Sequence, residues 1–75
     1  MEKRPPTLTA LGEKLRAYRE KQQLTQEALA EKADLDPTYI SGIERGVRNP
    51  SVISLARVAN GLGISLSEFF KGVDR

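Results

Sequence analysis

The sequence predicts an all-α fold, a compact bundle of five short helices in one domain. Apolar residues recur every three or four positions in the successive segments, which is the helical period. Ser, Thr or Asp stands in front of these segments, where its side chain can cap the first turn, and Gly or Pro interrupts the chain between them. The 75 residues, 39% hydrophobic and 29% charged, suffice for a single globular domain.

The first helix is expected over about residues 9–22, after a short N-terminal arm over residues 1–8. Thr7 and Thr9 are both acceptable N-cap residues. The helix has one apolar face, made of Leu8, Leu11, Leu15 and Tyr18. The proline pair before it indicates a mobile arm, which is either an ordinary frayed terminus, the favoured interpretation, or a segment that touches nucleic acid.

Two short helices follow. Thr25 caps a segment over residues 26–33 that is rich in alanine and glutamate, and both favour helix. Asp36 caps the next helix, which runs from Pro37 to about Arg45, because proline suits the first helical position. Gly46 is expected to end it.

The fourth helix begins after Ser51 and ends at Gly61 or Gly63. Its apolar positions are Val52, Leu55, Ala56, Ala59 and Leu62. A last short helix is capped by Ser65 or Ser67. The folded domain is therefore expected over residues 9–71, with its last helix used for dimerisation and residues 72–75 frayed.

The segment 25–46 has the pattern of a helix-turn-helix. Its two short helices are joined by three or four residues, and the first has Ala30 where the second must approach closely. Leu35 in the turn, together with Ile40 and Ile43, would fix the second helix against the core.

The other face of that second helix is unusual for a surface. It presents small or hydrogen-bonding residues, Pro37, Thr38, Tyr39, Ser41 and Gly42, where a solvated helix more often has Lys and Glu. Small and hydroxyl side chains let a helix enter the major groove and contact base edges. A solvated face that happens to be small is the alternative.

Four segments of the chain carry a wider pattern. They are Leu24-Thr25-Gln26-Glu27-Ala28-Leu29-Ala30, Tyr39-Ile40-Ser41-Gly42-Ile43-Glu44-Arg45-Gly46, Arg48-Asn49-Pro50 and Leu62-Gly63-Ile64-Ser65-Leu66. Together they resemble the Cro/C1-type (XRE) helix-turn-helix family over about residues 11–70. Within it the resemblance is greatest to the controller proteins of restriction–modification systems. It implies a lambda-repressor-like DNA-binding domain that forms a homodimer and binds its own promoter.

Two positions depart from that family. Asp34 stands in the turn where relatives usually have glycine, and aspartate tolerates the left-handed conformation better than most residues. Pro37 stands where controller proteins often have arginine, and proline cannot make a bidentate contact to guanine. The operator sequence of that group is therefore not carried over.

Eight residues are expected to contact DNA: Gln26, Thr38, Tyr39, Ser41, Gly42, Arg45, Arg48 and Asn49. Gln26 begins a helix, where the backbone N–H groups favour a phosphate. Thr38 and Tyr39 open the recognition helix and are base-reading candidates, although the ring of Tyr39 could instead serve a phosphate or cover the core edge. The resemblance implies a base contact for Arg48 and phosphate contacts for Arg45 and Asn49; solvated charges are the alternative for the two arginines.

Two further sets have structural roles. The resemblance implies an ion pair between Arg19 and Glu44 that ties the first helix to the recognition helix. The chain end carries a surplus of large apolar residues, Ile64, Leu66, Phe69 and Phe70, that a domain this small can hardly bury. We expect them to form a dimer interface, and filling of the monomer core is the alternative.

The composition excludes several classes of function. Without Cys or His the chain has no disulfide, no thiol catalysis and no Cys/His zinc site, and no catalytic constellation presents itself, so neither an enzyme nor a cofactor is expected. No apolar run approaches a membrane span, and a cytoplasmic location is expected. The expected function is sequence-specific transcriptional regulation by a homodimer on a roughly palindromic double-stranded DNA operator, with RNA polymerase as a further partner if the protein activates. The alternative is a protein-interaction module such as the antitoxin of a toxin–antitoxin pair.

Overall fold

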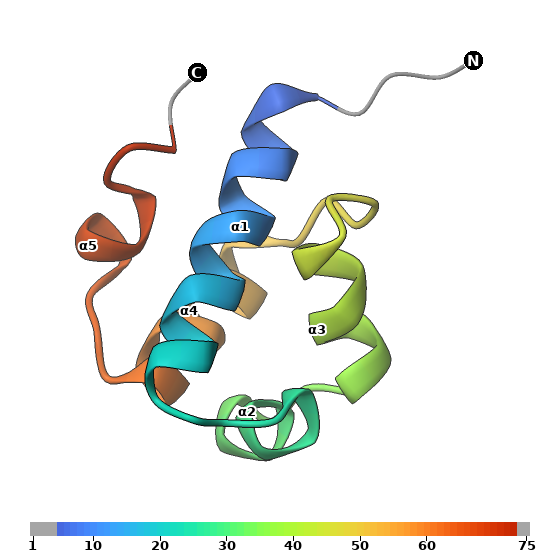
Figure 1. Ribbon diagram of the computed structural model, residues 1–75, viewed down its shortest axis with the longest axis vertical. Coiled ribbons are helices and arrows are strands. Elements are labelled where there is room, and N and C mark those ends of the chain that lie inside the picture. The colour runs from blue at the N-terminus through green and yellow to red at the C-terminus, as the bar shows by residue number, and fades with distance from the viewer. Residues whose placement is uncertain (1–4, 74–75) are drawn as a thin grey trace.

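The computed structural model describes residues 5–73 and confirms an all-α architecture. Within that range it contains five helices and no strand: α1 (Pro6–Lys21), α2 (Gln26–Ala33), α3 (Pro37–Glu44), α4 (Val52–Leu62) and α5 (Leu66–Phe70). Figure 1 shows α1 running through the middle of the molecule, with α3 on one side of it, α5 on the other and α2 at one end. No helix of the described residues is both long and apolar enough to cross a bilayer.

Helix α1 begins earlier than expected. It starts at Pro6 after Pro5, which supplies no side-chain cap, and the carbonyl of Pro5 accepts from the N–H groups of Leu8 and Thr9. Proline at the first helical position has a suitable φ and no N–H to leave unpaired. Residues 6–8 of the predicted arm are therefore helical, and residues 1–4 lie outside the described range.

The N-caps follow the sequence closely. The side chains of Thr25, Asp36, Ser51 and Ser65 each accept a hydrogen bond from a backbone N–H in the first turn of the helix that follows. Gly63, at φ +74°, ends α4. The left-handed position that ends α2 is taken by Asp34 at φ 57°, a conformation that aspartate tolerates better than most residues.

The cap of α3 is expected to make stability depend on acid. The Thr38 N–H donates to Asp36 Oδ1 over 2.8 Å and holds the pKa of this carboxyl below its ordinary value. The stabilisation is therefore present above the unfolded-state pKa of about 3.9 and is lost as the pH falls through the lower folded-state pKa. Thermal melts of the wild type and of Asp36→Asn, which caps without titrating, should differ most near neutral pH. A difference in melting temperature that is the same at about pH 7 and about pH 2.5 would contradict this.

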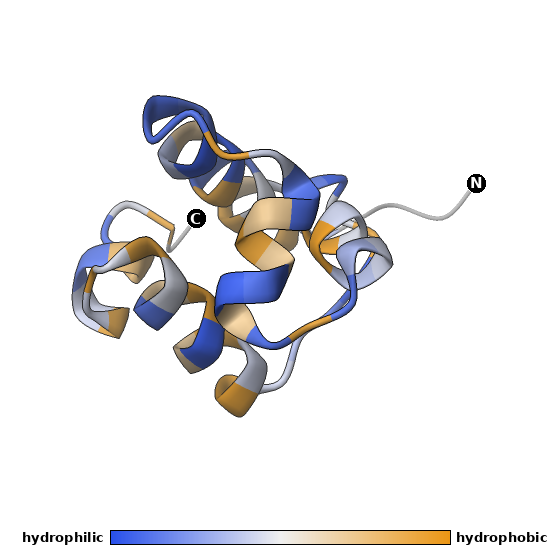
Figure 2. Cartoon of the chain, turned by 90° about the horizontal axis from the view of Figure 1, so that it is seen from below, coloured by the Kyte–Doolittle hydropathy of each residue, from blue (hydrophilic) through white to orange (hydrophobic). Residues whose placement is uncertain are grey.

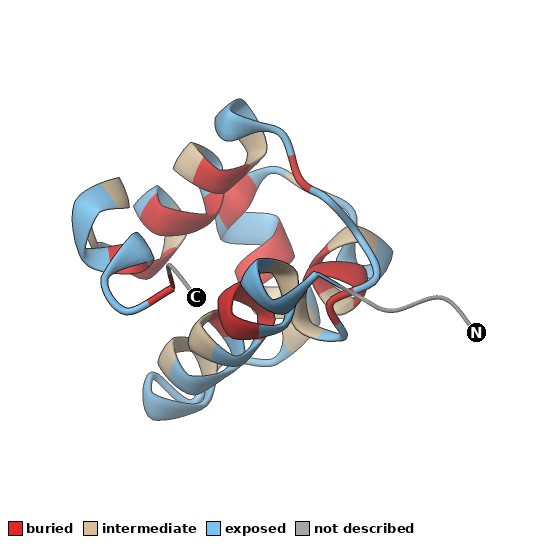
Figure 3. Cartoon of the chain, turned by 90° about the horizontal axis from the view of Figure 1, so that it is seen from above, coloured by how far each residue is buried: buried red, intermediate tan, exposed pale blue. Residues whose placement is uncertain are grey.

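The core lies where the five helices meet. Each helix carries both hydrophobic and hydrophilic stretches (Figure 2), and the buried stretches face the interior between the helices (Figure 3). The largest fully buried side chains are Phe69, Leu15, Leu29, Ile40, Ile43 and Val58. Val73 is also buried, so the expectation that the chain frays from residue 72 is wrong at this position; residues 74–75 are outside the described range.

Helices α1 and α3 approach each other closely at Gly12. A methyl group on Gly12 would collide with the carbonyl oxygens of Ile43 and Glu44, the latter at 2.5 Å. Gly12 is buried in the helical interior of α1, where glycine is otherwise unfavourable. This glycine therefore sets how near the recognition helix lies to the rest of the domain.

Candidate nucleic-acid interface

The helix-turn-helix unit is held together from within. Ala30 of α2 and both isoleucines of α3, Ile40 and Ile43, are buried. The turn is closed by the N–H of Leu35, which donates to the carbonyl of Ala30 over 2.9 Å. One side of α3 thus faces the core, and the positions expected to contact DNA begin on its other side.

Arg19 and Glu44 form the expected ion pair, with two contacts. Arg19 Nε lies 2.6 Å from Glu44 Oε2 and Nη2 lies 3.1 Å from Oε1, while Nη1 donates to the carbonyl of Leu24 over 2.7 Å. The two side chains are only 12% and 4% exposed. The hydrogen bond to Glu44 raises the pKa of Arg19 further above its ordinary value. The pair ties α1, the loop before α2, and the end of α3 into one unit.

Gln26 joins this network. Its Nε2 donates to Glu44 Oε1 over 3.1 Å, and its side chain is half-buried. This contact could not be predicted from the sequence, because it joins residues that are distant along the chain. The remaining amide N–H and the amide oxygen of Gln26 are not used in this bond, and they stand at the start of α2.

In Figure 1 the loop that follows α3 lies at the end of that helix, and one side of α3 faces away from α1. Thr38, Arg45, Arg48 and Asn49 are exposed, and Ser41 is half-buried. Arg45 Nε donates to Ser41 Oγ over 3.3 Å. The structure therefore brings most of the expected contact residues onto one face.

Tyr39 is half-buried and has partners at both ends of its side chain. Its hydroxyl oxygen accepts from the backbone N–H of Ser51 over 3.4 Å, and the guanidinium of Arg48 lies 4.9 Å from the ring centroid. The ring is thus covered by Arg48 and is not a free stacking face.

Gly42 does not belong to the exposed face. It is buried, and a methyl group there would lie 3.1 Å from Arg48 Cβ. The expectation that Gly42 lies against DNA is wrong because the loop folds back over this position. Its missing side chain makes room for Arg48 instead.

The expected dimer surface is smaller than the sequence suggested. Phe69 is fully buried and fills the monomer core, so its place in an interface is corrected. Ile64 and Leu66 are half-buried against the core, and Phe70 is 40% exposed. Two apolar side chains at the start of α4 are exposed: Val52, which the sequence analysis counted among the apolar positions of this helix, is 72% exposed, and Ile53, which it did not name, is 68% exposed.

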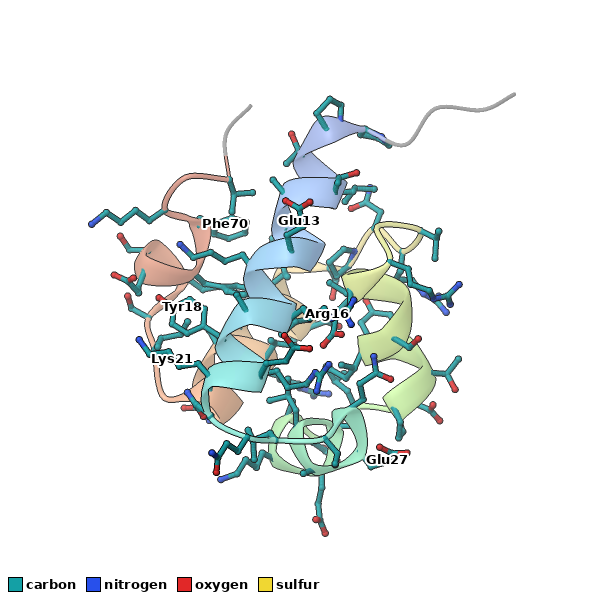
Figure 4. All side chains as sticks on the ribbon, in the orientation of Figure 1. Glu13, Arg16, Tyr18, Lys21, Glu27 and Phe70 are labelled. Atoms are coloured by element: carbon teal, nitrogen blue, oxygen red, sulfur yellow. The ribbon has the colours of Figure 1, made fainter. Side chains whose placement is uncertain are left out.

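Helix α5 is fastened to α1 by polar contacts as well. Tyr18 donates its hydroxyl proton to Glu68 Oε2 over 2.6 Å, and Lys14 Nζ donates to the carbonyl of Lys71 over 2.7 Å. The Tyr18–Glu68 hydrogen bond raises the pKa of Tyr18 and lowers the pKa of Glu68. Figure 4 shows Tyr18, Lys21 and Phe70 on the side of α1 nearer α5, away from α3.

Comparison with known proteins gives this geometry a context. The model of the family described as helix-turn-helix matches residues 15–69. Control protein C.MunI from Mycoplasma sp is 48% identical over 65 residues, which cover 85% of this chain and 88% of that protein. The restriction–modification controller protein C.AhdI from Aeromonas hydrophila has a crystal structure with a TM-score of 0.82 at 40% identity, over 84% of this chain and 96% of that one.

A second solved controller protein was crystallised with DNA. The structure of the C.Esp1396I tetramer in complex with its natural 35 base-pair operator has a TM-score of 0.82 at 40% identity, over 89% of this chain and 88% of that chain. The extent of the family match, the identity to a control protein and the shared fold agree with one another. The chain belongs to the Cro/C1-type (XRE) helix-turn-helix family.

Proposed function

We propose that this protein is a sequence-specific DNA-binding transcriptional regulator that acts as a homodimer and controls its own operon as a restriction–modification controller. One observation carries the proposal. The core side of α3 is fixed by buried isoleucines and by the Arg19–Glu44 pair, while its other side presents exposed Thr38 and the loop after it presents exposed Arg48. A rigid helix with polar groups on its free face can enter a major groove and meet base edges.

The proposed contacts divide into two kinds. Thr38 and Arg48 read bases, because a hydroxyl with an adjacent methyl group and a guanidinium both match base edges in the major groove. Arg45, Asn49, Ser41 and the free part of the Gln26 amide contact phosphates, which fix the protein on the duplex without reading sequence. Tyr39 adds a phosphate contact through its hydroxyl hydrogen.

The partner set follows from symmetry. Two copies related by a two-fold axis place their α3 helices in successive major grooves, so the operator is roughly palindromic with half-site centres about 34 Å apart. Repression needs only this DNA and a second copy, and activation adds RNA polymerase as a partner. A regulator that binds the promoter of its own gene works where that DNA lies, and the proposed location is therefore the cytoplasm.

The test is binding to the DNA upstream of the protein's own gene. Fluorescence anisotropy at fixed salt should show tighter binding to this duplex than to a scrambled duplex of the same length, since non-specific binding rests on phosphate contacts alone. Equal affinity for the two duplexes would refute the proposed function.

Replacing Arg48 with alanine should remove discrimination more than affinity. A good base contact contributes about 1–3 kcal/mol of discrimination against the wrong base, so binding to the specific duplex should weaken while binding to the scrambled duplex changes little. Arg16→Ala is the matched control, because Arg16 is an arginine on α1 with 64% of its side chain exposed. Equal weakening on both duplexes by Arg48→Ala would make Arg48 a phosphate contact.

Replacing Phe70 with alanine should weaken dimerisation without unfolding the chain. Phe70 is the exposed member of the aromatic pair, with its ring centroid 6.0 Å from that of buried Phe69. Removing exposed apolar surface costs the monomer little but deprives an interface of its largest side chain. Sedimentation across micromolar concentrations should show the variant dissociating at a higher concentration than the wild type. A wild type that is monomeric at every concentration would remove the dimer from the proposal.

A further inference from the structure

The loop after α3 folds back onto the helix that precedes it. The backbone N–H groups of Val47 and Arg48 both donate to the carbonyl of Gly42, over 3.1 and 3.2 Å. The side chain of Arg48 then runs over Gly42, whose added methyl group would lie 3.1 Å from Arg48 Cβ and 3.7 Å from Nε. Only glycine at position 42 lets the Arg48 side chain lie this close to α3 without being displaced.

The guanidinium of Arg48 is held one helical turn nearer the start of α3, by Tyr39. The guanidinium carbon lies 4.9 Å from the ring centroid of Tyr39, within the range of a cation–π interaction. Tyr39 and Gly42 are three residues apart in α3 and therefore share a face. The Tyr39 hydroxyl accepts from Ser51 N–H, which ties the ring to the residue that caps α4. The Arg48 guanidinium thus lies over Tyr39, which is next to Thr38, although Arg48 follows Thr38 by ten positions in the sequence.

We propose that Gly42 and Tyr39 are positioning residues that hold the Arg48 side chain in its base-reading direction before DNA arrives. We call these two residues the Arg48 cradle. An arginine side chain loses rotamer freedom when it binds, and holding it in advance lowers that cost. The proposal rests on the proposed function of Arg48 as a base reader. The cradle therefore raises sequence discrimination and leaves the affinity for random DNA unchanged.

Gly42→Ala tests the stem side of the cradle. The fold should persist, because alanine favours helix and the nearest atoms belong to an exposed loop side chain that can move by a few tenths of an ångström. The ratio of affinities for the specific and the scrambled duplex should fall about fivefold to tenfold, because the arginine is displaced from its direction. Affinity for the scrambled duplex should stay as in the wild type.

Variants of Tyr39 test the ring side of the cradle. They also keep the proposal testable if Gly42→Ala does not fold. Tyr39→Phe keeps the ring face, so the ratio of affinities should be retained even where both affinities fall through loss of the hydroxyl. Tyr39→Leu removes the face, and the ratio should fall about two- to fivefold. A merely structural role of Tyr39 would lower both affinities together in Tyr39→Leu.

The decisive measurement repeats these changes in an Arg48→Ala background. There the cradle has no guanidinium to hold, so Gly42→Ala and Tyr39→Leu should leave the ratio where Arg48→Ala put it. The cradle is refuted if Arg48→Ala lowers the ratio while Gly42→Ala and Tyr39→Leu, made in the wild type, do not. It is also refuted if they lower the ratio equally with and without Arg48. A wild type that binds both duplexes alike would refute the proposed function, and this inference with it.

Discussion

Gly12→Ala is expected to lower the stability of this protein more than the same change at any other glycine that the structure describes. The new carbon would collide with the backbone carbonyls of Ile43 and Glu44, which cannot move without unwinding the end of α3. Overpacking a closed interior costs about 3 kcal/mol in severe cases, and the better helix propensity of alanine offsets only about 1 kcal/mol. A small domain has little stability to lose, so Gly12→Ala should melt at a much lower temperature or not fold.

The matched control is Gly61→Ala, also a glycine within a helix. A methyl group at Gly61 would find its nearest neighbour, a methyl carbon of Leu29, at 3.3 Å, a contact that a small side-chain adjustment relieves. Circular dichroism melts of the two variants should therefore separate widely. Melting of Gly12→Ala at the wild-type temperature would show that α1 and α3 can move apart without loss.

Breaking the Arg19–Glu44 pair should destabilise the protein by a comparable amount. Arg19→Ala leaves the Glu44 carboxylate, 4% exposed, beside a vacated space and with one remaining partner in Gln26. Removing one member of a fully buried pair costs about 3–5 kcal/mol, because the other charge stays buried without compensation, and for this part-buried pair the loss should lie at or below the lower end of that range. Urea denaturation should show a lower midpoint for Arg19→Ala and for Glu44→Ala.

A double variant separates the pair from its surroundings. Arg19→Met with Glu44→Leu removes both charges together and should recover part of the loss, because no uncompensated charge remains. The control is Arg16→Ala, which breaks an exposed ion pair with Glu20 and should shift the midpoint little. Losses that add in the double variant would mean that the two charges do not interact.

Local signals explain what the sequence predicts well. The four side-chain caps act within the turn they begin, so Thr25, Asp36, Ser51 and Ser65 can be identified without knowledge of the rest of the fold. The start of α1 was missed because it depends on a proline that replaces a capping side chain.

Features that depend on distant parts of the chain could not be predicted in the same way. Phe69 and Phe70 are identical neighbours, and the packing of α5 against α1 and α4 makes one core and the other surface. Gly12 is an ordinary helical glycine until α3 is laid against it, and Gly42 looks like part of an open face until the loop covers it. The Arg19–Glu44 pair could be predicted because the resemblance to a family implied that these two residues lie close together in the fold.

Helix α1 has a consequence for the spacing of any paired site. It carries α3 on one side, through Gly12 and Arg19, and α5 on the other, through Tyr18 and Lys14. The surface proposed to read DNA and the surface proposed to meet a second copy are thus mounted on one helix of 16 residues, with no hinge between them. In a dimer built this way, the distance and angle between the two α3 helices are fixed. One base pair inserted between the half-sites would rotate them by about 36° relative to each other, and the protomer cannot bend within its own fold to follow that rotation.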